Sequence, residues 1–314
     1  MPFVDALREA FAADRVKLQI PLAPLTTFRV GGIAEYLLEP RSSDEIVTAL
    51  RIAAAHAVPV TLLGGGSNVL IADAGIRGLV LRPRGGEARI VDRRSGAVVR
   101  ADAAMTINGL VRWTVTHAVA GLEAWAGTPG TVGGAIFGNA HFDGRNIGEL
   151  VASVRIAARD GAVRDVPAAA MGFGYDRSRL QQTAEVLLSA DFRAAPGDPS
   201  ALRAVARQSL AFRKRTQPLD TPSAGCIFQN PQRGVDTVPD GIPWSAGALV
   251  DRAGLKDRAV GGARVSSAHA NFIVNDGPAT AAEIRALIDL CKAAVREQFG
   301  VELREEIVYL GDWG

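Results

Sequence analysis

The sequence predicts an α+β fold of two or three domains. Its 314 residues exceed the length of one average domain. Helical periodicity appears over residues 41–57 and 280–300, whereas the middle of the chain alternates short apolar runs with Gly and Asp turns. Apolar residues make up 48% of the chain and charged residues 22%, which suits a globular protein with a sizeable core.

The first predicted domain, residues 1–82, combines one helix with short strands. Ser42 and Glu45 form a capping-box pattern at the start of the helix 41–57. The run "VPVTLLGGGSNVLI" (58–71) predicts a buried strand, a glycine loop and a second strand, and "GIRGLVLRP" predicts another strand.

The second predicted domain, residues 83–200, is mainly β. Its strands are predicted by "RIVDRRSGAVVRADA", "LVASVRIAARDGAVRDVP" and "AEVLLSADFR". The stretch 106–121 predicts a helix with a C-cap glycine, Gly121. A second glycine-rich stretch, "GTPGTVGGAIFGNA" (127–140), predicts a loop, and "AAPGDPSAL" (194–202) marks a domain boundary.

The third predicted domain, residues 201–314, opens with the helix "PSALRAVARQSLAFRKR". Thr280 and Glu283 form a capping box for the helix 280–300, and Gly300 ends it. The stretch "VELREEIVYLG" predicts a closing strand.

Charge and composition exclude several kinds of partner. The formal net charge is +2 and the basic residues are dispersed, which gives little support to binding of nucleic acid or a membrane surface. No apolar run approaches the roughly 18 residues of a membrane span, and the charged N-terminus lacks a signal-peptide core. We expect a monomeric cytoplasmic protein. Two cysteines and four scattered histidines predict neither a disulfide framework nor a metal site.

Both glycine loops are candidate phosphate sites. Glycines after a strand let backbone N–H groups converge on a phosphate without obstruction by side chains. The loop "LLGGGSN" (62–68) lacks the Lys-Ser/Thr of a P-loop, and no helix obviously follows it, as a dinucleotide fingerprint requires. A plain tight turn is the alternative for each loop alone, but two such loops suit a dinucleotide better than a mononucleotide.

Two further residues are candidates for acid–base chemistry. Cys226, in "PSAGCIFQNP", has no histidine nearby in sequence, but a thiol with an ordinary pKa of about 8.5 is protonated at neutral pH and can donate a proton. By itself such a cysteine is more often a core residue, as Cys291 on its apolar helix face illustrates. Glu306 lies where one face of the closing strand changes from polar to apolar, so it is either a general acid at the edge of the core or a solvated surface residue.

Eight stretches, in order, resemble one family, the UDP-N-acetylenolpyruvoylglucosamine reductases (MurB). The resemblance spans nearly the whole chain and is closest to the shorter, second type, since the third domain lacks a tyrosine-bearing insertion. The eight stretches are "TTFRVGG", "LLGGGSNVLI", "GTPGTVGGAIFGNA", "FGYDRSR", "SAGCIFQNP", "SAGALVDRAGLK", "GGARVSSAHANFIVN" and "FGVELREEIVYLG".

The resemblance implies an FAD-binding fold of the vanillyl-alcohol oxidase/PCMH type in the first two domains, and an α/β substrate-binding domain in the third. It implies that one glycine loop holds the FAD pyrophosphate and that the other lines the isoalloxazine. The implied cofactor residues are Gly64, Gly65, Gly66, Ser67 and Asn68 in the first loop, and Gly127, Thr128, Gly130, Gly133, Gly134 and Asn139 in the second.

The implied reaction belongs to peptidoglycan precursor synthesis. NADPH would reduce the flavin, and UDP-N-acetylglucosamine enolpyruvate would then take the hydride and become UDP-N-acetylmuramate. Negative charge builds on the substrate carboxylate, so a neighbouring cation or carboxylic acid lowers the barrier. The resemblance implies that Cys226 donates the proton, that Glu306 is the second catalytic group, and that Tyr175 and Asn230 contact the substrate.

One position departs from the family pattern. The family usually has Gly-Tyr-Arg-x-Ser, where the arginine polarises the carboxylate, but this chain has Asp176 at that position. Arg177 is our candidate replacement, Arg179 is a second, and an ordinary surface arginine is the alternative. Lys214 and His269 are candidates for the substrate diphosphate, as is Arg213; these five side chains are assigned from the resemblance alone.

Two other classes of protein remain open. A flavin oxidase or dehydrogenase of the same fold would share the glycine loops but not the combination of "SAGCIFQNP" with the Glu306 strand. A flavin-binding protein without activity would have no reason to keep Cys226, Asn230 and Glu306 together.

Overall fold

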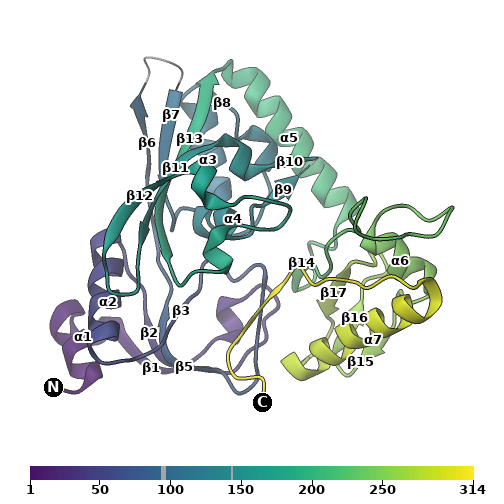
Figure 1. Ribbon diagram of the computed structural model, residues 1–314, viewed down its shortest axis with the longest axis horizontal. Helices are drawn as coiled ribbons and strands as arrows, with labels where there is room; N and C mark the ends of the chain where they lie inside the picture. The colour runs from purple at the N-terminus through teal and green to yellow at the C-terminus, as the bar shows by residue number, and fades with distance from the viewer. Residues whose placement is uncertain (93–96, 143) are drawn as a thin grey trace. The chain divides into compact units, whose positions relative to one another are not determined.

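The computed structural model describes residues 1–92, 97–142 and 144–314 (Figure 1). Its helices are α1 (Phe3–Phe11), α2 (Ser43–Ala55), α3 (Ile107–Thr116), α4 (Val132–Phe137), α5 (Pro199–Thr216), α6 (Ala246–Arg252) and α7 (Ala281–Phe299). The strands of the first half are β1 (Val16–Pro21), β2 (Ile33–Leu38), β3 (Val60–Leu62), β4 (Val69–Ile71), β5 (Ile76–Leu81), β6 (Ala88–Asp92), β7 (Ala97–Asp102), β8 (Val119–Ala120), β9 (His141–Phe142) and β10 (Arg145–Asn146). The later strands are β11 (Val151–Ala157), β12 (Val163–Pro167), β13 (Val186–Pro196), β14 (Ser223–Cys226), β15 (Ala259–Val260), β16 (Ala263–Val265), β17 (Phe272–Asn275) and β18 (Val308–Leu310). Helices and sheets together confirm the predicted α+β class.

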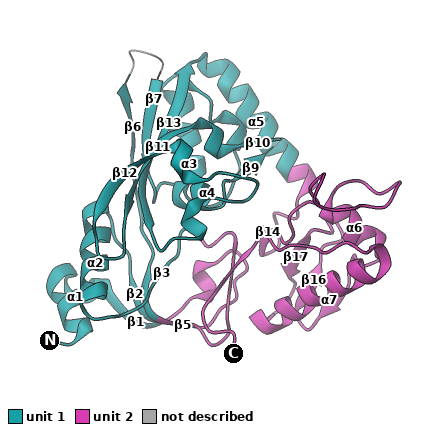
Figure 2. Ribbon diagram, viewed as in Figure 1, with its two compact units in different colours: residues 1–19, 35–65, 78–213 teal, residues 20–34, 66–77, 214–314 magenta. Residues whose placement is uncertain are grey.

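The chain forms two compact units, each made of separate segments (Figure 2). Unit 1 comprises residues 1–19, 35–65 and 78–213, and unit 2 comprises residues 20–34, 66–77 and 214–314. The division into domains 1–82, 83–200 and 201–314 stays a prediction. The turn predicted between β6 and β7 falls on residues 93–96, outside the described residues.

The N-terminal part of unit 1 is a small sheet with two helices. The strand order is β1-β2-β5-β3, and β3 runs parallel to β5. Apolar side chains of α1 and α2, among them Leu7, Phe11 and Leu50, are buried in one cluster with Leu79 of β5. The predicted helix and strands of this region are confirmed, and α1 is an additional element.

Helix α2 begins as predicted, but its predicted capping box is only half formed. The Ser42 side chain accepts a hydrogen bond from Glu45 N–H at 3.2 Å. The Glu45 carboxylate accepts from Arg41 N–H at 2.7 Å and forms two hydrogen bonds with Arg15, at 2.7 and 2.8 Å. The charge-assisted bonds to Arg15 are stronger than a bond to the helix-cap amide, and they direct the carboxylate away from Ser42.

Replacing Glu45 with glutamine is expected to lower the free energy of unfolding by about 1–2 kcal/mol at neutral pH. Hydrogen bonding to Arg15 lowers the pKa of the Glu45 carboxyl from 4.5 to about 2. Because the folded-state pKa is lowered, this stabilisation is present above the unfolded value and is lost as the pH falls toward about 2. Urea denaturation of wild type and variant at pH 7 and about pH 2.5 measures the difference, which should shrink at the lower pH. An equal difference at both pH values would contradict this account.

The rest of unit 1 is an antiparallel sheet with strand order β12-β11-β13-β7-β6, on which β8 pairs with β13. Its core contains Leu110 of α3, Ile136 of α4 and Phe192 of β13.

Helix α3 ends at Thr116 and not at the predicted C-cap Gly121, because the chain leaves the helix to form β8 against the end of β13. The predicted loop 127–140 is also partly wrong, since it contains the short helix α4. The predicted helix after the boundary is confirmed as α5.

Unit 2 contains a second antiparallel sheet, β14-β17-β16-β15, with α6 and α7. The capping box of α7 is formed by Thr280 and Glu283, and Gly300 ends the helix with φ 68°, as predicted. The regular part of the closing strand is shorter than predicted, because only β18 pairs continuously, in parallel with β4. Residues before β18 make a single bridge between Glu305 and Phe228.

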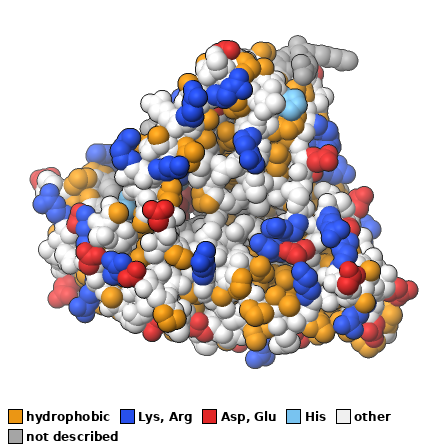
Figure 3. All heavy atoms as spheres, turned by 180° about the vertical axis from the view of Figure 1, so that it is seen from behind, with side chains coloured by type: hydrophobic (Ala, Val, Ile, Leu, Met, Phe, Trp, Pro, Cys, Tyr) orange, Lys and Arg blue, Asp and Glu red, His pale blue; other side chains and the backbone are white. Residues whose placement is uncertain are grey.

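Charged side chains are mixed on the surface. On the face shown in Figure 3, Lys and Arg stand among Asp, Glu and apolar groups, in line with the dispersed charge of the sequence. Among the described residues, no helix has the length and apolar character that crossing a membrane requires.

Candidate active site

The first glycine loop, Gly64–Asn68, joins β3 to β4 and has unused donors. Its flanks are fixed: Leu63 N–H donates to Leu81 O at 2.9 Å, and Asn68 O accepts from Val308 N–H at 3.0 Å. Within the part of the chain that the structure describes, the loop's own backbone N–H groups donate to no protein acceptor. Successive amide donors in a tight glycine loop suit an anion such as a pyrophosphate.

The second glycine loop lies against the first within unit 1. A Cβ atom on Gly65 would stand 2.6 Å from the Cα atom of Gly130, and one on Gly64 would stand 2.8 Å from Oγ1 of Thr131. Real Cβ atoms essentially never approach other atoms this closely, so the contact between the loops requires glycine. The two predicted loops therefore meet, as they would if they shared one dinucleotide.

Two side chains hold the start of the second loop: Asn108, which the sequence did not single out, and Arg213, which was a candidate for the substrate diphosphate. Asn108 of α3 accepts a hydrogen bond from Gly127 N–H at 2.7 Å and donates to Thr128 O at 3.2 Å. Arg213 is buried; its Nη2 donates to Thr128 Oγ1 at 2.9 Å, and its guanidinium lies 4.1 Å from the centre of the Phe142 ring. These contacts give Arg213 a loop-supporting role. A polar residue in the first turn of a helix is too common to have predicted the contacts of Asn108.

The end of the second loop is fixed by Asn139. Its Nδ2 donates to Gly174 O at 2.7 Å, and its Oδ1 accepts from Gly148 N–H at 2.8 Å. Asn139 is 2% exposed, so its side chain connects buried backbone groups. The direct cofactor contact assigned to it stays a prediction.

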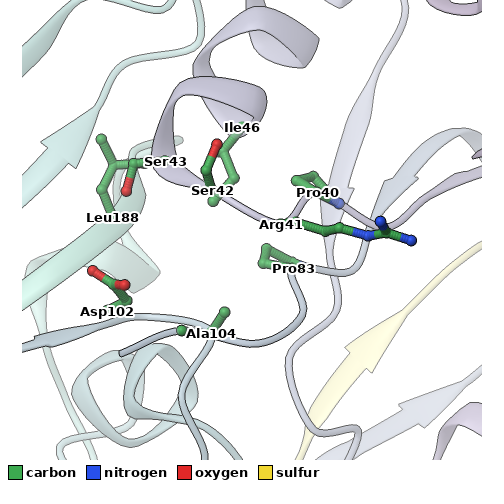
Figure 4. A pocket seen from close by; sticks show the side chains of 10 residues that line it. Pro40, Arg41, Ser42, Ser43, Ile46, Pro83, Asp102, Ala104 and Leu188 are labelled. Carbon is green, nitrogen blue, oxygen red and sulfur yellow. The ribbon is translucent and has the colours of Figure 1, made fainter. Parts of the chain in front are cut away.

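A hollow at the start of α2 is too small for a cofactor. It is lined by side chains that include Arg41, Ser42, Asp102 and Leu188 (Figure 4). Its volume of about 20 Å³ is enough for about one water molecule. The flavin site is therefore better assigned to the two glycine loops than to this hollow.

Cys226 ends strand β14 in unit 2. The pairing of β14 with β17 changes register between Ser223 and Cys226, and Gly225 there has φ 82°. This conformation favours glycine and produces a bulge just before the thiol. Cys226 pairs with Phe272 and is half-buried, and its thiol is not in a disulfide.

Asn271 holds the segment that follows the thiol. Its Oδ1 accepts from Phe228 N–H at 2.9 Å, and its Nδ2 donates to Phe228 O at 2.8 Å. Its own carbonyl accepts from Ile227 N–H at 2.8 Å. Asn271 is 3% exposed, and a polar residue within the apolar stretch "HANFIV" was the only sequence signal for this role.

The closing strand lies beside the same segment. Glu306 N–H donates to Ile227 O at 2.8 Å, and Gln229 N–H donates to Arg304 O at 2.8 Å. Asn68, from the first glycine loop, donates from Nδ2 to Glu306 O at 3.1 Å. The structure thus brings together Cys226, Glu306 and the end of the first loop, three features that are far apart in the sequence.

Replacing Asn271 with alanine is expected to destabilise unit 2 by about 2–4 kcal/mol, because a buried N–H and C=O of Phe228 lose their partners. Amide hydrogen exchange at Phe228 should accelerate together with that of Ile227. Exchange measured by mass spectrometry over residues 223–229 checks this, with the exposed change Ser267→Ala as control. Unchanged protection at Ile227 and Phe228 would contradict it.

The remaining residues assigned to the substrate have varied surroundings. Asn230 is exposed and accepts from Ala246 N–H at 3.0 Å, and Lys214 is exposed at the end of α5. His269 is half-buried; its Nδ1 accepts from Asn271 N–H at 3.2 Å, and burial lowers its pKa, which makes the ring neutral at pH 7. The roles of these residues stay predictions.

Cys291 is a core residue, as predicted: it is 1% exposed, and burial raises its pKa to about 12.

The segment that departs from the family pattern is a tight turn in unit 1. Gly174 and Arg177 exchange backbone hydrogen bonds of 3.0 and 3.2 Å, and Asp176 has φ 50°. The Asp176 side chain is buried, whereas Arg177 is exposed and its guanidinium folds back over Gly174. Arg179 forms hydrogen bonds of 3.0 and 3.2 Å with Glu185.

Two domain families match the chain. Residues 34–167 match the family described as "FAD binding domain". With the fold and the paired glycine loops, this match defines an FAD-binding flavoprotein of the vanillyl-alcohol oxidase/PCMH type. Residues 217–310 match "UDP-N-acetylenolpyruvoylglucosamine reductase, C-terminal domain". The chain belongs to the UDP-N-acetylenolpyruvoylglucosamine reductase family and is an oxidoreductase.

Relatives of this family match over almost the whole chain. UDP-N-acetylenolpyruvoylglucosamine reductase 2 of Symbiobacterium thermophilum is 37% identical over 99% of this chain and 97% of its own length. The reductase of Parasynechococcus marenigrum is 40% identical over 94% of this chain and 96% of its own length. The crystal structure of the reductase (MurB) from Thermus caldophilus has a TM-score of 0.76 and 29% identity, and covers 94% of this chain and 99% of that one. The predicted family is confirmed.

Proposed function

We propose that the chain catalyses the NADPH-dependent reduction of UDP-N-acetylglucosamine enolpyruvate to UDP-N-acetylmuramate. One observation within unit 2 carries the proposal. Asn68 of the first glycine loop donates from Nδ2 to the backbone carbonyl of Glu306, and Glu306 N–H donates to the carbonyl of Ile227, which follows Cys226. Hydrogen bonds to the backbone therefore hold the candidate cofactor loop next to the segments that carry the Glu306 carboxylate and the Cys226 thiol. Membership of the reductase family supports the choice of substrate.

The glycine loops suit FAD. When bound, FAD would supply the hydride chemistry that connects NADPH with the enolpyruvyl double bond of the substrate. The amide donors of Gly64–Asn68 would hold the pyrophosphate, and the second loop, Gly127–Asn139, would line the isoalloxazine. The close contact at Gly65 and Gly130 supports this assignment, because it leaves no side chain between the loops.

Cys226 is the proposed proton donor. The hydride forms a C–H bond at the methylene carbon, and the electron pair of the double bond moves to the carbon that carries the carboxylate. A proton from Cys226 Sγ then forms the second C–H bond there, and the resulting thiolate regains a proton from solvent. The half-buried thiol at the end of β14 supports this role.

Charge stabilisation and substrate binding complete the proposal. Glu306 and a cation, for which Arg177 is the candidate from the sequence, would stabilise the charge that develops on the substrate carboxylate. Tyr175, Asn230, Lys214 and His269 would contact the rest of the substrate. Since His269 is neutral at pH 7, it would act on the diphosphate as a hydrogen-bond donor and not as a cation. A monomeric state and a cytoplasmic location remain predictions.

Purification and a two-step assay test this function. The purified protein should be yellow, with about one FAD per chain. It should oxidise NADPH rapidly only when UDP-N-acetylglucosamine enolpyruvate is present, and UDP-N-acetylmuramate should appear in equal amount by mass spectrometry. A colourless protein that takes up no FAD, or NADPH oxidation that ignores the substrate, would refute the proposal.

A further inference from the structure

The stretch "TTFRVGG" (26–32) holds an exposed arginine in a backbone conformation that favours glycine. Arg29 has φ 56°, in the left-handed region that a residue with a side chain rarely adopts. Its neighbours Phe28 and Val30 are buried, with 0% and 4% exposure, whereas Arg29 is exposed. The turn therefore places two apolar side chains in the core of unit 2 and leaves the cation between them at the surface.

Hydrogen bonds from inside and outside the turn fix this conformation. Arg29 N–H donates to Thr26 O at 3.3 Å, and Thr26 Oγ1 donates to Val30 O at 3.1 Å. From β17, Asn275 Nδ2 donates to Phe28 O at 2.9 Å. A strained residue persists only where its surroundings determine its conformation, and such residues gather at ligand sites. Because glycine would avoid the strain, an arginine at this position points to a need for its side chain.

The same turn contacts the first glycine loop. Thr27 donates twice to Gly66 O, from its N–H at 2.9 Å and from its Oγ1 at 3.3 Å. A Cβ atom on Gly66 would stand 2.2 Å from Leu25 O, so backbone lies directly against backbone. All these residues belong to unit 2 (Figure 2). Arg29 is two residues from Thr27, a span of at most about 7 Å, so its long side chain can reach an anion bound at the loop.

The turn and the loop both offer donors to an anion. The guanidinium of Arg29 forms no hydrogen bond or ion pair with any residue that the structure describes. In the same part of the chain, the backbone N–H groups of Gly66, Ser67 and Asn68 donate to no protein acceptor. A guanidinium next to successive backbone amides is complementary to the oxygen atoms of a diphosphate.

An open hollow beside the turn is large enough for part of a nucleotide. Ala23, Pro24 and Arg29 line it, and its volume is about 420 Å³. Ligand sites usually measure roughly 300–1,000 Å³ and combine apolar walls with a few polar groups. Two apolar side chains and one cation suit the adenosine diphosphate end of a dinucleotide, which joins a flat base to negatively charged phosphates.

We propose that Arg29 pairs with the diphosphate of FAD, together with the amide donors of the first glycine loop. This role rests on the proposed function, which assigns the pyrophosphate to that loop. Arg29 is then a cofactor-binding residue and takes no part in the transfer of the hydride or the proton. NADPH also carries a diphosphate, so the experiment has one arm for each dinucleotide.

Titration of the FAD-depleted full-length chain with FAD, followed by flavin fluorescence, tests the proposal. Arg29→Ala should raise the dissociation constant of FAD roughly 10–100-fold, the range expected for a charge-assisted hydrogen bond. Arg29→Lys, which keeps a positive charge, should fall between the alanine variant and wild type. The difference between alanine variant and wild type should shrink from about 0.05 M to about 0.5 M salt. Arg258→Ala, the same change at another exposed arginine of unit 2, is the matched control and should bind FAD like wild type.

Arg29→Gly separates cofactor binding from folding. Glycine adopts φ 56° without strain, so the FAD-depleted variant should unfold at a urea concentration equal to or above that of wild type. Its dissociation constant for FAD should nevertheless rise as in Arg29→Ala, because the guanidinium is absent. If both variants lose FAD and also unfold at a lower urea concentration, Arg29 is a structural residue and the proposal is wrong.

The other outcomes distinguish the two dinucleotides and the two proposals. In FAD-saturated protein, the NADPH concentration that gives half-maximal flavin reduction should be equal in Arg29→Ala and wild type. A wild-type dissociation constant for FAD in Arg29→Ala overturns the role of Arg29, and a raised NADPH requirement would then assign the cation to NADPH. If Arg29→Ala binds FAD weakly but reduced wild type is not reoxidised by the enolpyruvyl substrate, the proposed function fails while the role of Arg29 stands. If wild type takes up no FAD, both fail.

Discussion

Replacing Cys226 with alanine is expected to leave reduction by NADPH near normal and to slow reoxidation by the enolpyruvyl substrate by roughly 10²–10⁴-fold. The two half-reactions differ because only the second needs a proton at carbon. The thiol can be removed without loss of the surrounding backbone bonds, since Ile227 and Phe228 are held by Asn271 and the closing strand. Stopped-flow absorbance of the flavin measures both half-reactions separately.

Cys226→Ser is the matched variant for this test. A hydroxyl at the same position can deliver the same proton, so the serine protein should keep much of the wild-type rate of reoxidation. Cys291→Ser is a second control, because Cys291 is buried in the core of unit 2 and has no proposed role in the reaction. If the alanine variant is reoxidised as fast as wild type, Cys226 is a packing residue and another group donates the proton.

Replacing Gly65 with alanine is expected to abolish FAD binding at micromolar cofactor. The added Cβ would stand 2.6 Å from the Cα atom of Gly130, and 3.3 Å from its carbonyl carbon, so backbone has to move on one side. Separation of the loops would displace the amide donors that the pyrophosphate needs, and each lost charge-assisted hydrogen bond costs about 1.5–3 kcal/mol. The variant should purify colourless, and titration with FAD followed by fluorescence measures the loss.

Gly277→Ala is the matched control for the glycine test. Gly277 is exposed, and a Cβ added there would have Gly262 Cα as its nearest neighbour, at 4.0 Å, which is an ordinary contact. This protein should bind FAD like wild type. A Gly65→Ala protein that is yellow, with an FAD content equal to that of the control, would show that the loop contact does not hold the cofactor.

Local signals in the sequence predicted the ends of several elements. The Thr280–Glu283 box and Gly300 predicted both ends of α7, and Ser42 predicted the start of α2, because a cap depends on atoms only a few residues away. The predictions that proved wrong were those in which a distant group intervened. Glu45 turns to Arg15 in place of the helix cap, which no pattern of neighbouring residues contains.

The glycine loops also combine features that the local sequence predicts with features that depend on the tertiary structure. The residues "LLGGGSN" and "GTPGTVGGAIFGNA" predicted two phosphate-type loops, since the composition of each is local. That Gly65 contacts Gly130, and that the second loop includes α4, depended on how the layers of unit 1 pack. The hydrogen bond from Gly127 N–H to Asn108 Oδ1 likewise required α3 to lie beside the start of the second loop.

The sequence by itself determined the α+β class, the glycine loops and, through ordered resemblance, the family and its candidates Cys226 and Glu306. The tertiary structure decided which side chains serve those candidates. Asn271 reaches Phe228 across 43 positions of the chain, and Thr27 reaches Gly66 across 39. Such partners are specified by strand register and loop packing, which are long-range properties, whereas residue types and short spacings are visible in any stretch of sequence.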